Sequence, residues 1–217
     1  MRVRGAVWTG ASSWCDEFSK SPATYAAEAG IRVDDKPMPL FQLLVLCMLA
    51  SKPIDATTAM RAARELFKTG LRTPKTVLAS DRRTMISAFG RAHYVRYDES
   101  SATRFTDMAE QARDEYSGDL REIASRSQQD IGEAKRMLKK FNGIGETGAD
   151  IYLREVQDVW TWVRPYFDDR ATAAAKQLGL PADASKLASL APRANARLAA
   201  ALVRVALDDD LHRQVTG

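Results

Sequence analysis

Two closely spaced glycines, Gly143 and Gly145, constrain the fold of this chain more than any other sequence feature. They separate residues 131–140 from a stretch that begins at about Thr147, and both flanking stretches read as helices. Glycine reaches positive φ angles without strain and lets another backbone approach closely. The pattern therefore predicts two helices joined by a tight hairpin.

The side chains around these glycines fit a hairpin that packs against a core. Leu138, Phe141 and Ile144 are apolar at hairpin spacing, and Ile144 is expected to plug the core. The amides of the hairpin and of the next helical turn would then point outward and, with the helix dipole, form a phosphate site. A glycine-x-glycine triplet also occurs in ordinary helical turns, so the flanking apolar pattern carries this prediction.

Nearly every other segment also predicts a helix, and none shows the alternation typical of a strand. Asp55 and Thr73 precede segments with helical patterns and are expected to cap them, and Asp81 begins another. The sequence therefore predicts an all-α fold. The expected helices cover residues 39–50, 56–69, 74–79, about 81–90, about 100–116, 120–125, 131–140, about 147–159, 168–178 and 191–207.

The composition fits an intracellular globular protein. The chain has 217 residues, 45% of them hydrophobic, and a net charge of +4. This mild positive charge fits a polyanionic partner such as DNA, although many soluble proteins without such a partner share it. No stretch approaches the ~20 apolar residues that a membrane span needs. We therefore expect a cytoplasmic protein that binds no membrane.

The cysteines and histidines are too few and too scattered to predict a metal site. Cys15 and Cys47 are far apart, and so are His93 and His212. A structural zinc site or an iron–sulfur cluster needs about four such ligands. We expect no metal and no cofactor, with Cys47 as a small buried thiol within an apolar run.

The segment 137–150 resembles the helix-hairpin-helix motif of the endonuclease III superfamily of base-excision DNA glycosylases. The likeness extends over residues 39–207. Residues 44–55 are similar to the opening barrel helix of that family and the loop after it. In that loop the family places a polar residue that enters the duplex, and Lys52 occupies this position. Asp55 matches the family's helix-capping aspartate.

Further along the chain, residues 167–170 and the Leu-Gly-Leu of 178–180 resemble the family's catalytic aspartate and the helix that follows it. Counting back from 178–180 favours Asp168 as the match, whereas a shift of one residue would favour Asp169. Such a carboxylate stabilises the cationic sugar that forms as an N-glycosidic bond breaks, and it can take a proton from water. A plain helix cap is the alternative role for either residue.

The resemblance implies two helical lobes with a DNA-binding cleft between them. Residues 38–160 would form the barrel lobe with the hairpin, and residues 1–37 plus 161–217 the second lobe. The implied function is hydrolysis of a damaged or mispaired base from double-stranded DNA after the base has flipped out of the helix. We expect a monomer that is associated with the nucleoid.

Two departures from the family change the expected chemistry. Bifunctional members carry a lysine in the second helix of the motif, and its amine attacks the sugar. Thr147 stands at that position here, so lyase activity should be weak or absent. Many relatives also have four cysteines near the C-terminus, and this chain has none after Cys47.

Other side chains are candidates for DNA contact, each with an ordinary structural alternative. Alternatives to DNA contact are a solvated helix face for lysines beside the hairpin, an interhelical loop for residues 90–97 and a core position for the aromatic residues. Gly143, Ile144, Gly145, Thr147, Lys139 and Lys140 are assigned to the phosphate backbone. Lys52, Arg91, His93 and Tyr94 are assigned to the wedge loops, and Trp160, Trp162 and Tyr166 to the base pocket.

Two rival functions remain open at this point. The chain could be a helix-hairpin-helix protein that binds DNA without turnover, or a helical protein-interaction module whose glycines are purely structural. The position of Asp168 relative to a cleft bears on the first rival, and salt-dependent DNA binding on the second.

Overall fold

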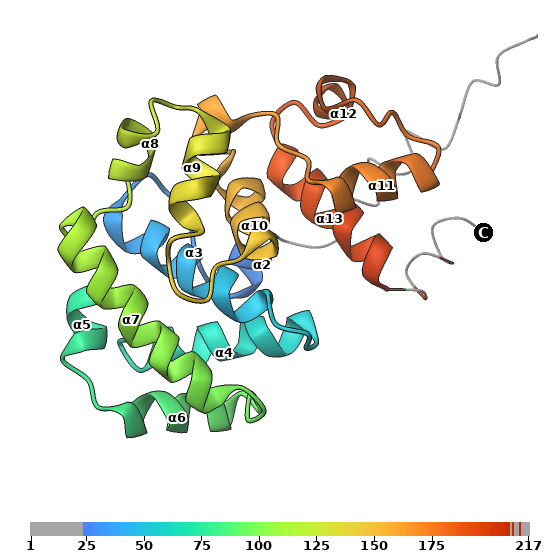
Figure 1. The fold of residues 1–217 in the computed structure, drawn as a ribbon. Helices are drawn as coiled ribbons and strands as arrows, with labels where there is room; N and C mark the ends of the chain where they lie inside the picture. The colour runs from blue at the N-terminus through green and yellow to red at the C-terminus, as the bar shows by residue number, and fades with distance from the viewer. Residues whose placement is uncertain (1–23, 209, 211–212, 214–217) are drawn as a thin grey trace, which may run out of the picture.

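A computed structural model describes residues 24–208, 210 and 213, and within them the chain is all helical (Figure 1). The predicted all-α fold is therefore confirmed, and no strand occurs in this part of the chain. Residues 1–23, which include Cys15, and His212 lie outside the described residues. The helices are α2 (Tyr25–Glu28), α3 (Pro37–Ala50), α4 (Ala56–Lys68), α5 (Pro74–Leu78), α6 (Arg82–Arg91), α7 (Asp98–Tyr116), α8 (Glu122–Arg126), α9 (Ile131–Leu138), α10 (Glu146–Val156), the short 3-10 helix η1 (Thr161–Val163), α11 (Asp169–Gln177), α12 (Ala184–Leu190) and α13 (Asn195–Leu207).

Capping side chains set several helix starts where the sequence predicted them. The carboxylate of Asp55 accepts a hydrogen bond from the Thr58 amide at 3.0 Å, which begins α4. Thr73 begins α5 and Asp81 begins α6 through equivalent bonds to the amides three residues on. Each such cap stabilises a helix by about 1 kcal/mol, so these boundaries follow from local sequence alone.

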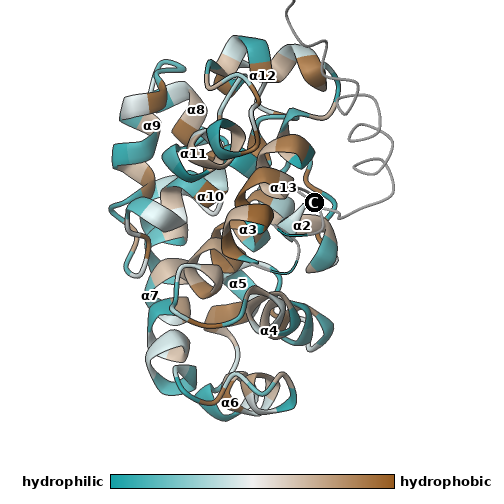
Figure 2. Ribbon diagram, turned by 90° about the vertical axis from the view of Figure 1, so that its right-hand side faces the viewer, coloured by the Kyte–Doolittle hydropathy of each residue, from teal (hydrophilic) through white to brown (hydrophobic). Residues whose placement is uncertain are grey.

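Helix α3 is the centre of the molecule because it is apolar on all sides. Every residue from Pro39 to Leu49 is buried, including the thiol of Cys47 as predicted. A helix that is apolar all round is stable only when other elements surround it. Helices α4, α7 and α10 pack around it, and its brown ribbon runs through the middle of Figure 2.

The buried apolar residues form two clusters. The larger one runs from Tyr25 to Val163 and includes α3 and α10, and it takes in the described N-terminal residues Tyr25 to Ile31. The smaller one lies between α11, α12 and α13, from Ala171 to Val205. Helix α13 packs against both α11 and α10, so it connects the two clusters. Within residues 24–208, 210 and 213 no helix is both long enough and apolar enough to cross a membrane.

Some elements near the C-terminus differ from the prediction. Helix α12 was not predicted, and the last helix begins at Asn195 rather than at residue 191. Leu187 of α12 is buried and Leu190 is partly buried against the smaller cluster, so this short helix adds few residues to the core. What starts α12 is a cap, because the Asp183 carboxylate accepts a hydrogen bond from the Lys186 amide at 2.9 Å.

Candidate functional site

The turn between α9 and α10 uses the freedom of one of its two glycines. Gly143 has a φ of +94°, and a Cβ atom there would lie 2.7 Å from Cδ of Arg104 and 3.0 Å from Cγ of Met48. Gly145 has a φ of −96°, which any residue adopts. The tight turn therefore requires glycine at position 143, and another reason is needed for position 145.

The apolar residues of the turn anchor it to the core as predicted. Leu138, Phe141 and Ile144 are all buried, and the Ile144 amide donates to the Phe141 carbonyl at 3.0 Å. Ile144 also contacts Gly148 on the first turn of α10. The buried side chains therefore fix the turn to the core, and its backbone faces outward.

The amino end of α10 is open. Gly145 is its N-cap without a side-chain cap, and a Cβ atom there would have no neighbour within 4 Å. Within the part of the chain that the structure describes, no acceptor takes the amide hydrogens of Gly145, Glu146 or Thr147. Unpaired amides at the positive end of a helix dipole suit an anionic ligand.

The lysine residues beside the hairpin differ in whether they pair with an acidic side chain. Lys139 pairs with Glu146 at 2.6 Å, and Lys135 pairs with Glu146 and Asp150. Hydrogen bonds from Lys135 and Lys139 lower the pKa of Glu146 to about 2, so this carboxylate stays charged. Lys140 is exposed and has no acidic partner among the described residues, which leaves its charge available.

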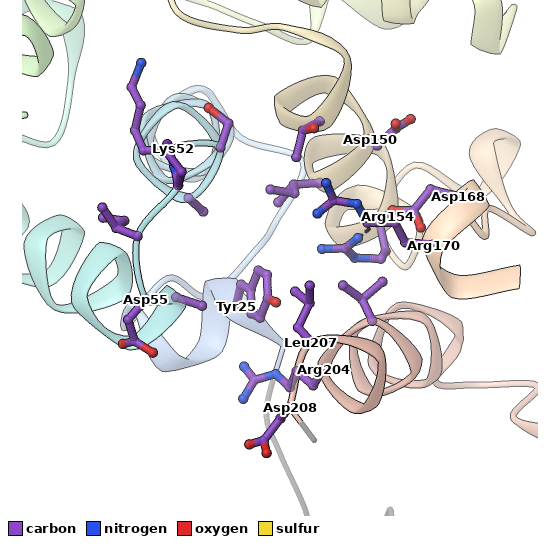
Figure 3. A pocket seen from close by; sticks show the side chains of 18 of the residues that line it. Tyr25, Lys52, Asp55, Asp150, Arg154, Asp168, Arg170, Arg204, Leu207 and Asp208 are labelled. Carbon is purple, nitrogen blue, oxygen red and sulfur yellow. Dashed lines mark hydrogen bonds and ion pairs between the residues drawn. The ribbon is translucent and has the colours of Figure 1, made fainter. Parts of the chain in front are cut away.

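A pocket of about 1430 Å³ lies beside the hairpin, between the loop after α3, one face of α10, the start of α11 and the end of α13 (Figure 3). Helix α10 lines it with Thr147, Asp150, Ile151 and Arg154. Residues three, four and seven positions apart share one face of a helix. Predicted site residues in the lining are Lys52, Thr147, Asp168 and Asp169.

The two candidate aspartates differ in their surroundings. Asp168 is 8% exposed and is the N-cap of α11, with its Oδ1 accepting from the Ala171 amide at 2.8 Å. Its Oδ2 accepts from Nη1 of Arg154 at 2.6 Å. Asp169 is exposed at the first position of α11. Asp168 is thus the carboxylate held in a fixed orientation at the pocket wall.

The sequence analysis missed Arg154, which is the most deeply buried charged side chain of the site. It is 1% exposed, and its guanidinium carbon lies 5.4 Å from the ring centre of Tyr25. Its Nη1 donates to Asp168, while Nε and Nη2 donate no hydrogen bond to any described residue. Its spacing of seven residues from Thr147 indicates that both lie on one face of α10. The sequence does not show that this face lines a pocket.

Tyr25 and Arg204 complete the floor of the pocket. The guanidinium carbon of Arg204 lies 4.8 Å from the ring centre of Tyr25. Burial raises the pKa of Tyr25, and the charges of Arg154 and Arg204 oppose that rise. The phenol therefore stays protonated, with its hydroxyl pointing toward the pocket in Figure 3.

Lys52 stands at the opposite edge of the pocket. Burial lowers its pKa, and the nearby charge of Arg104 lowers it further. Arg104, on α7, also lies against Gly143 and has no acidic partner among the described residues. Lys52, Arg104 and the hairpin amides therefore form one positively charged rim, and nothing in the sequence singled out Arg104 within its polar helix.

The loop after α6 does not reach the pocket. Arg91 pairs with Glu65 at 3.0 Å, and His93 is exposed with a φ of 59°. Tyr94 is 2% exposed, and its hydroxyl lies 3.2 Å from that of Ser101. The predicted DNA contact by Tyr94 is therefore replaced by a core position, because a buried ring has no face left for a ligand.

The aromatic residues expected in the base pocket lie beside it. Trp160 is buried, stacks on Trp162 and donates its indole hydrogen to Asp35 at 3.0 Å. Tyr166 donates its hydroxyl hydrogen to Asp150. Of the aromatic residues among those described, Tyr25 alone lines the pocket.

These aromatic residues instead lie in the connection between α10 and α11 that precedes Asp168. The Gln157 side chain accepts from the Tyr166 amide and donates to the Tyr166 carbonyl, each at 2.9 Å. This two-point clamp fixes the chain two residues before Asp168. The connection between residues 157 and 166 thus holds the start of α11 in place.

The sequence was also compared with protein-family models and with curated proteins, and neither comparison finds a match. The site must therefore be interpreted from its own chemistry. That chemistry is a fixed carboxylate and an arginine inside a pocket, next to a positively charged rim with open backbone amides.

Proposed function

We propose that this protein binds double-stranded DNA through a helix-hairpin-helix motif and hydrolyses the N-glycosidic bond of a base flipped into the pocket. The observation that carries the proposal is the position of Asp168. Its carboxylate lines the same pocket as Lys52 and Thr147, which lies in the first turn after the hairpin. A duplex on the rim would thus present a nucleotide to the carboxylate.

The rim would hold the DNA backbone without reading sequence. The amides of Gly145, Glu146 and Thr147 would donate to a phosphate, and Lys140 and Arg104 would add unpaired positive charge. Gly145 would be needed because a side chain there would occupy the space of the phosphate. Lys52 would lie where the duplex meets the pocket.

Asp168 would act on the sugar. As the bond from C1′ to the base breaks, positive charge develops on the deoxyribose, and the carboxylate would stabilise it. It would also accept a proton from the water that attacks C1′. Its hydrogen bonds from Ala171 and Arg154 hold the carboxylate in one orientation at the pocket wall.

The account implies two lobes around a cleft, with residues 38–160 as the barrel lobe and residues 1–37 plus 161–217 as the second. It implies a monomer without cofactor that acts on DNA in the cytoplasm. Lyase chemistry would be weak or absent, because Thr147 offers no amine. The amine of Lys52 extends away from Asp168 in Figure 3.

A panel of duplexes that each contain one damaged or mispaired base tests the proposal. With the protein in excess, we expect one member to lose its base and to give a strand break only after alkali. Borohydride should trap no covalent adduct on an abasic duplex. Failure to release any base would contradict the proposal, and efficient trapping would contradict its monofunctional form.

A second candidate function is DNA binding without catalysis. The buried ion pair between Arg154 and Asp168 favours it, because this pair also ties α10 to α11 and so has a purely structural use. Salt-dependent binding of duplex DNA with no base release across the panel would support this alternative.

A further inference from the structure

Arg154 has two hydrogen-bond donors that the fold leaves without acceptors. Its Nε and Nη2 atoms are buried and donate to no described residue, although the side chain lines the pocket. Buried polar groups in folded proteins are nearly always hydrogen-bonded. A buried pair of free donors at a pocket therefore marks a place where a ligand supplies the acceptors.

The geometry of guanidinium limits what that ligand can be. Nη1 is used by Asp168, so the free edge is the fork of Nε and Nη2, which offers two parallel N–H donors. The O6 and N7 atoms of a guanine-type base match such a fork. Adenine presents a donor beside N7, and thymine and uracil present a single acceptor on this edge.

The charge of the pocket favours a neutral ligand over a phosphate. The lining contains seven acidic and five basic residues, and Asp168 already compensates the charge of Arg154. A dianion beside Arg154 would also lie close to the carboxylate of Asp168. A neutral base with two acceptors would satisfy the fork without that repulsion.

We propose that Arg154 recognises a base with two adjacent acceptor atoms, in particular a 6-oxopurine such as hypoxanthine, and stabilises it as it leaves. This inference rests on the proposed glycosylase function and names its substrate class. The C1′–N9 bond breaks, and its electron pair passes into the purine, where hydrogen bonds from Arg154 to O6 and N7 share the charge. The water oxygen bonds to C1′, its proton goes to Asp168, and the departed base then takes up that proton.

The test compares binding and release across matched duplexes. Each carries one nucleotide with hypoxanthine, 7-deazahypoxanthine, adenine, uracil, 8-oxoguanine or mispaired cytosine. A 2′-fluoro version that resists hydrolysis reports affinity, and the ordinary version reports release. The wild type is compared with Arg154→Lys, which keeps a charge beside Asp168 but loses the fork. Arg113→Lys is the matched control, because Arg113 is exposed on α7 and pairs with its neighbour Asp114.

The wild type and the control should bind hypoxanthine at least about tenfold better than adenine, uracil or 8-oxoguanine, whose N7 carries a hydrogen. Arg154→Lys should lose this preference. A preference for cytosine that Arg154→Lys removes would also support the two-acceptor class, through the N3 and O2 atoms of that base. An unchanged preference in Arg154→Lys would overturn the inference.

The 7-deaza duplex keeps the test decisive if Arg154→Lys fails to fold. It removes the N7 acceptor from the ligand and leaves the protein unchanged, so wild-type binding should fall about tenfold. Equal binding of the two purines would overturn the inference. Selective binding without release would support recognition of the base by Arg154 but contradict the glycosylase proposal, and with it the role of Arg154 in base departure. Release without selectivity would support the glycosylase proposal and overturn the inference.

Discussion

The hairpin at residues 139–147 and the floor of the pocket are built in opposite ways. The hairpin is one continuous stretch of chain, and it presents backbone amides. The floor is made of the side chains of Tyr25, Arg154, Asp168 and Arg204, which come from four separate helix regions. Backbone groups suit a ligand that is the same at every DNA position, and assembled side chains suit discrimination among bases.

The two regions also differ in what their ion pairs contribute. Lys139 and Glu146 at the hairpin are exposed, and such pairs contribute about 0–1 kcal/mol. The side chains of Arg154 and Asp168 are 2% and 5% exposed, and breaking a buried pair by removing one partner costs about 3–5 kcal/mol. Substitutions of the buried pair on the floor should therefore affect chemistry and stability together, whereas loss of the exposed pair at the hairpin should change stability little.

The largest effect should follow from Asp168→Asn. Base release should fall about 100-fold or more, because the charge that stabilises the sugar cation and accepts the proton is lost. Affinity for duplex DNA should hold or rise. Unfolding in urea should show lower stability, since Arg154 is left without its carboxylate. Single-turnover kinetics below the unfolding temperature separate the two effects.

Asp169→Asn is the matched control for that measurement, because Asp169 is exposed at the next position in the chain. It should keep nearly full activity. A large loss in Asp169→Asn with full activity in Asp168→Asn would shift the catalytic assignment by one residue. Full activity in both variants would remove the carboxylate from the account.

Gly145→Asp should separate binding from stability at the hairpin. The new carboxylate would cap α10 and raise the unfolding free energy by a few tenths of a kcal/mol. It would also block the open amides and repel phosphate, so affinity for every duplex sequence should fall about tenfold. Fluorescence anisotropy and urea unfolding of the same sample measure both. Unchanged affinity would mean that the hairpin does not contact DNA.

Gly143→Ala should act on stability, in contrast to Gly145→Ala. At position 143 the added Cβ would meet Arg104 and Met48 at a positive φ, which should cost about 1–3 kcal/mol of unfolding free energy. At position 145 it would meet nothing within 4 Å. Equal stability of the two variants in urea would contradict the assignment of the turn to Gly143.

The smallest effect should come from Arg104→Met. Loss of one phosphate contact should lower the slope of log affinity against log salt by about 1, uniformly across sequences. Arg113→Met on the same helix should leave the slope unchanged, because Arg113 is paired with Asp114. A slope that falls equally in both variants would place the DNA elsewhere on the molecule.

The features that could be predicted from the sequence are those that depend on neighbouring residues. The caps at Asp55, Thr73 and Asp81 and the apolar plug at Ile144 needed no tertiary information. The place of Asp168 before a helix made a capping role foreseeable, whereas its preference over Asp169 came from the family resemblance. Each of these features is decided within about four residues of chain.

The floor could not be predicted, because it depends on how distant helices face one another. Arg154 is one charged residue on α10, and only its packing against Tyr25 and Asp168 sets it apart. Trp160 and Trp162 were expected in the pocket by their distance from the hairpin in sequence. The ring of Trp160 instead packs with Tyr152 of the core, and Trp162 stacks on Trp160, as aromatic residues at short spacing often do.

The most direct test of the central claim is a structure of the protein bound to a duplex with a 2′-fluoro nucleotide at the released base. The account predicts a phosphate at the amides of Gly145 to Thr147 and the base inside the pocket. It also predicts C1′ beside the carboxylate of Asp168. A base still stacked in the duplex, or DNA bound to another face of the molecule, would contradict it.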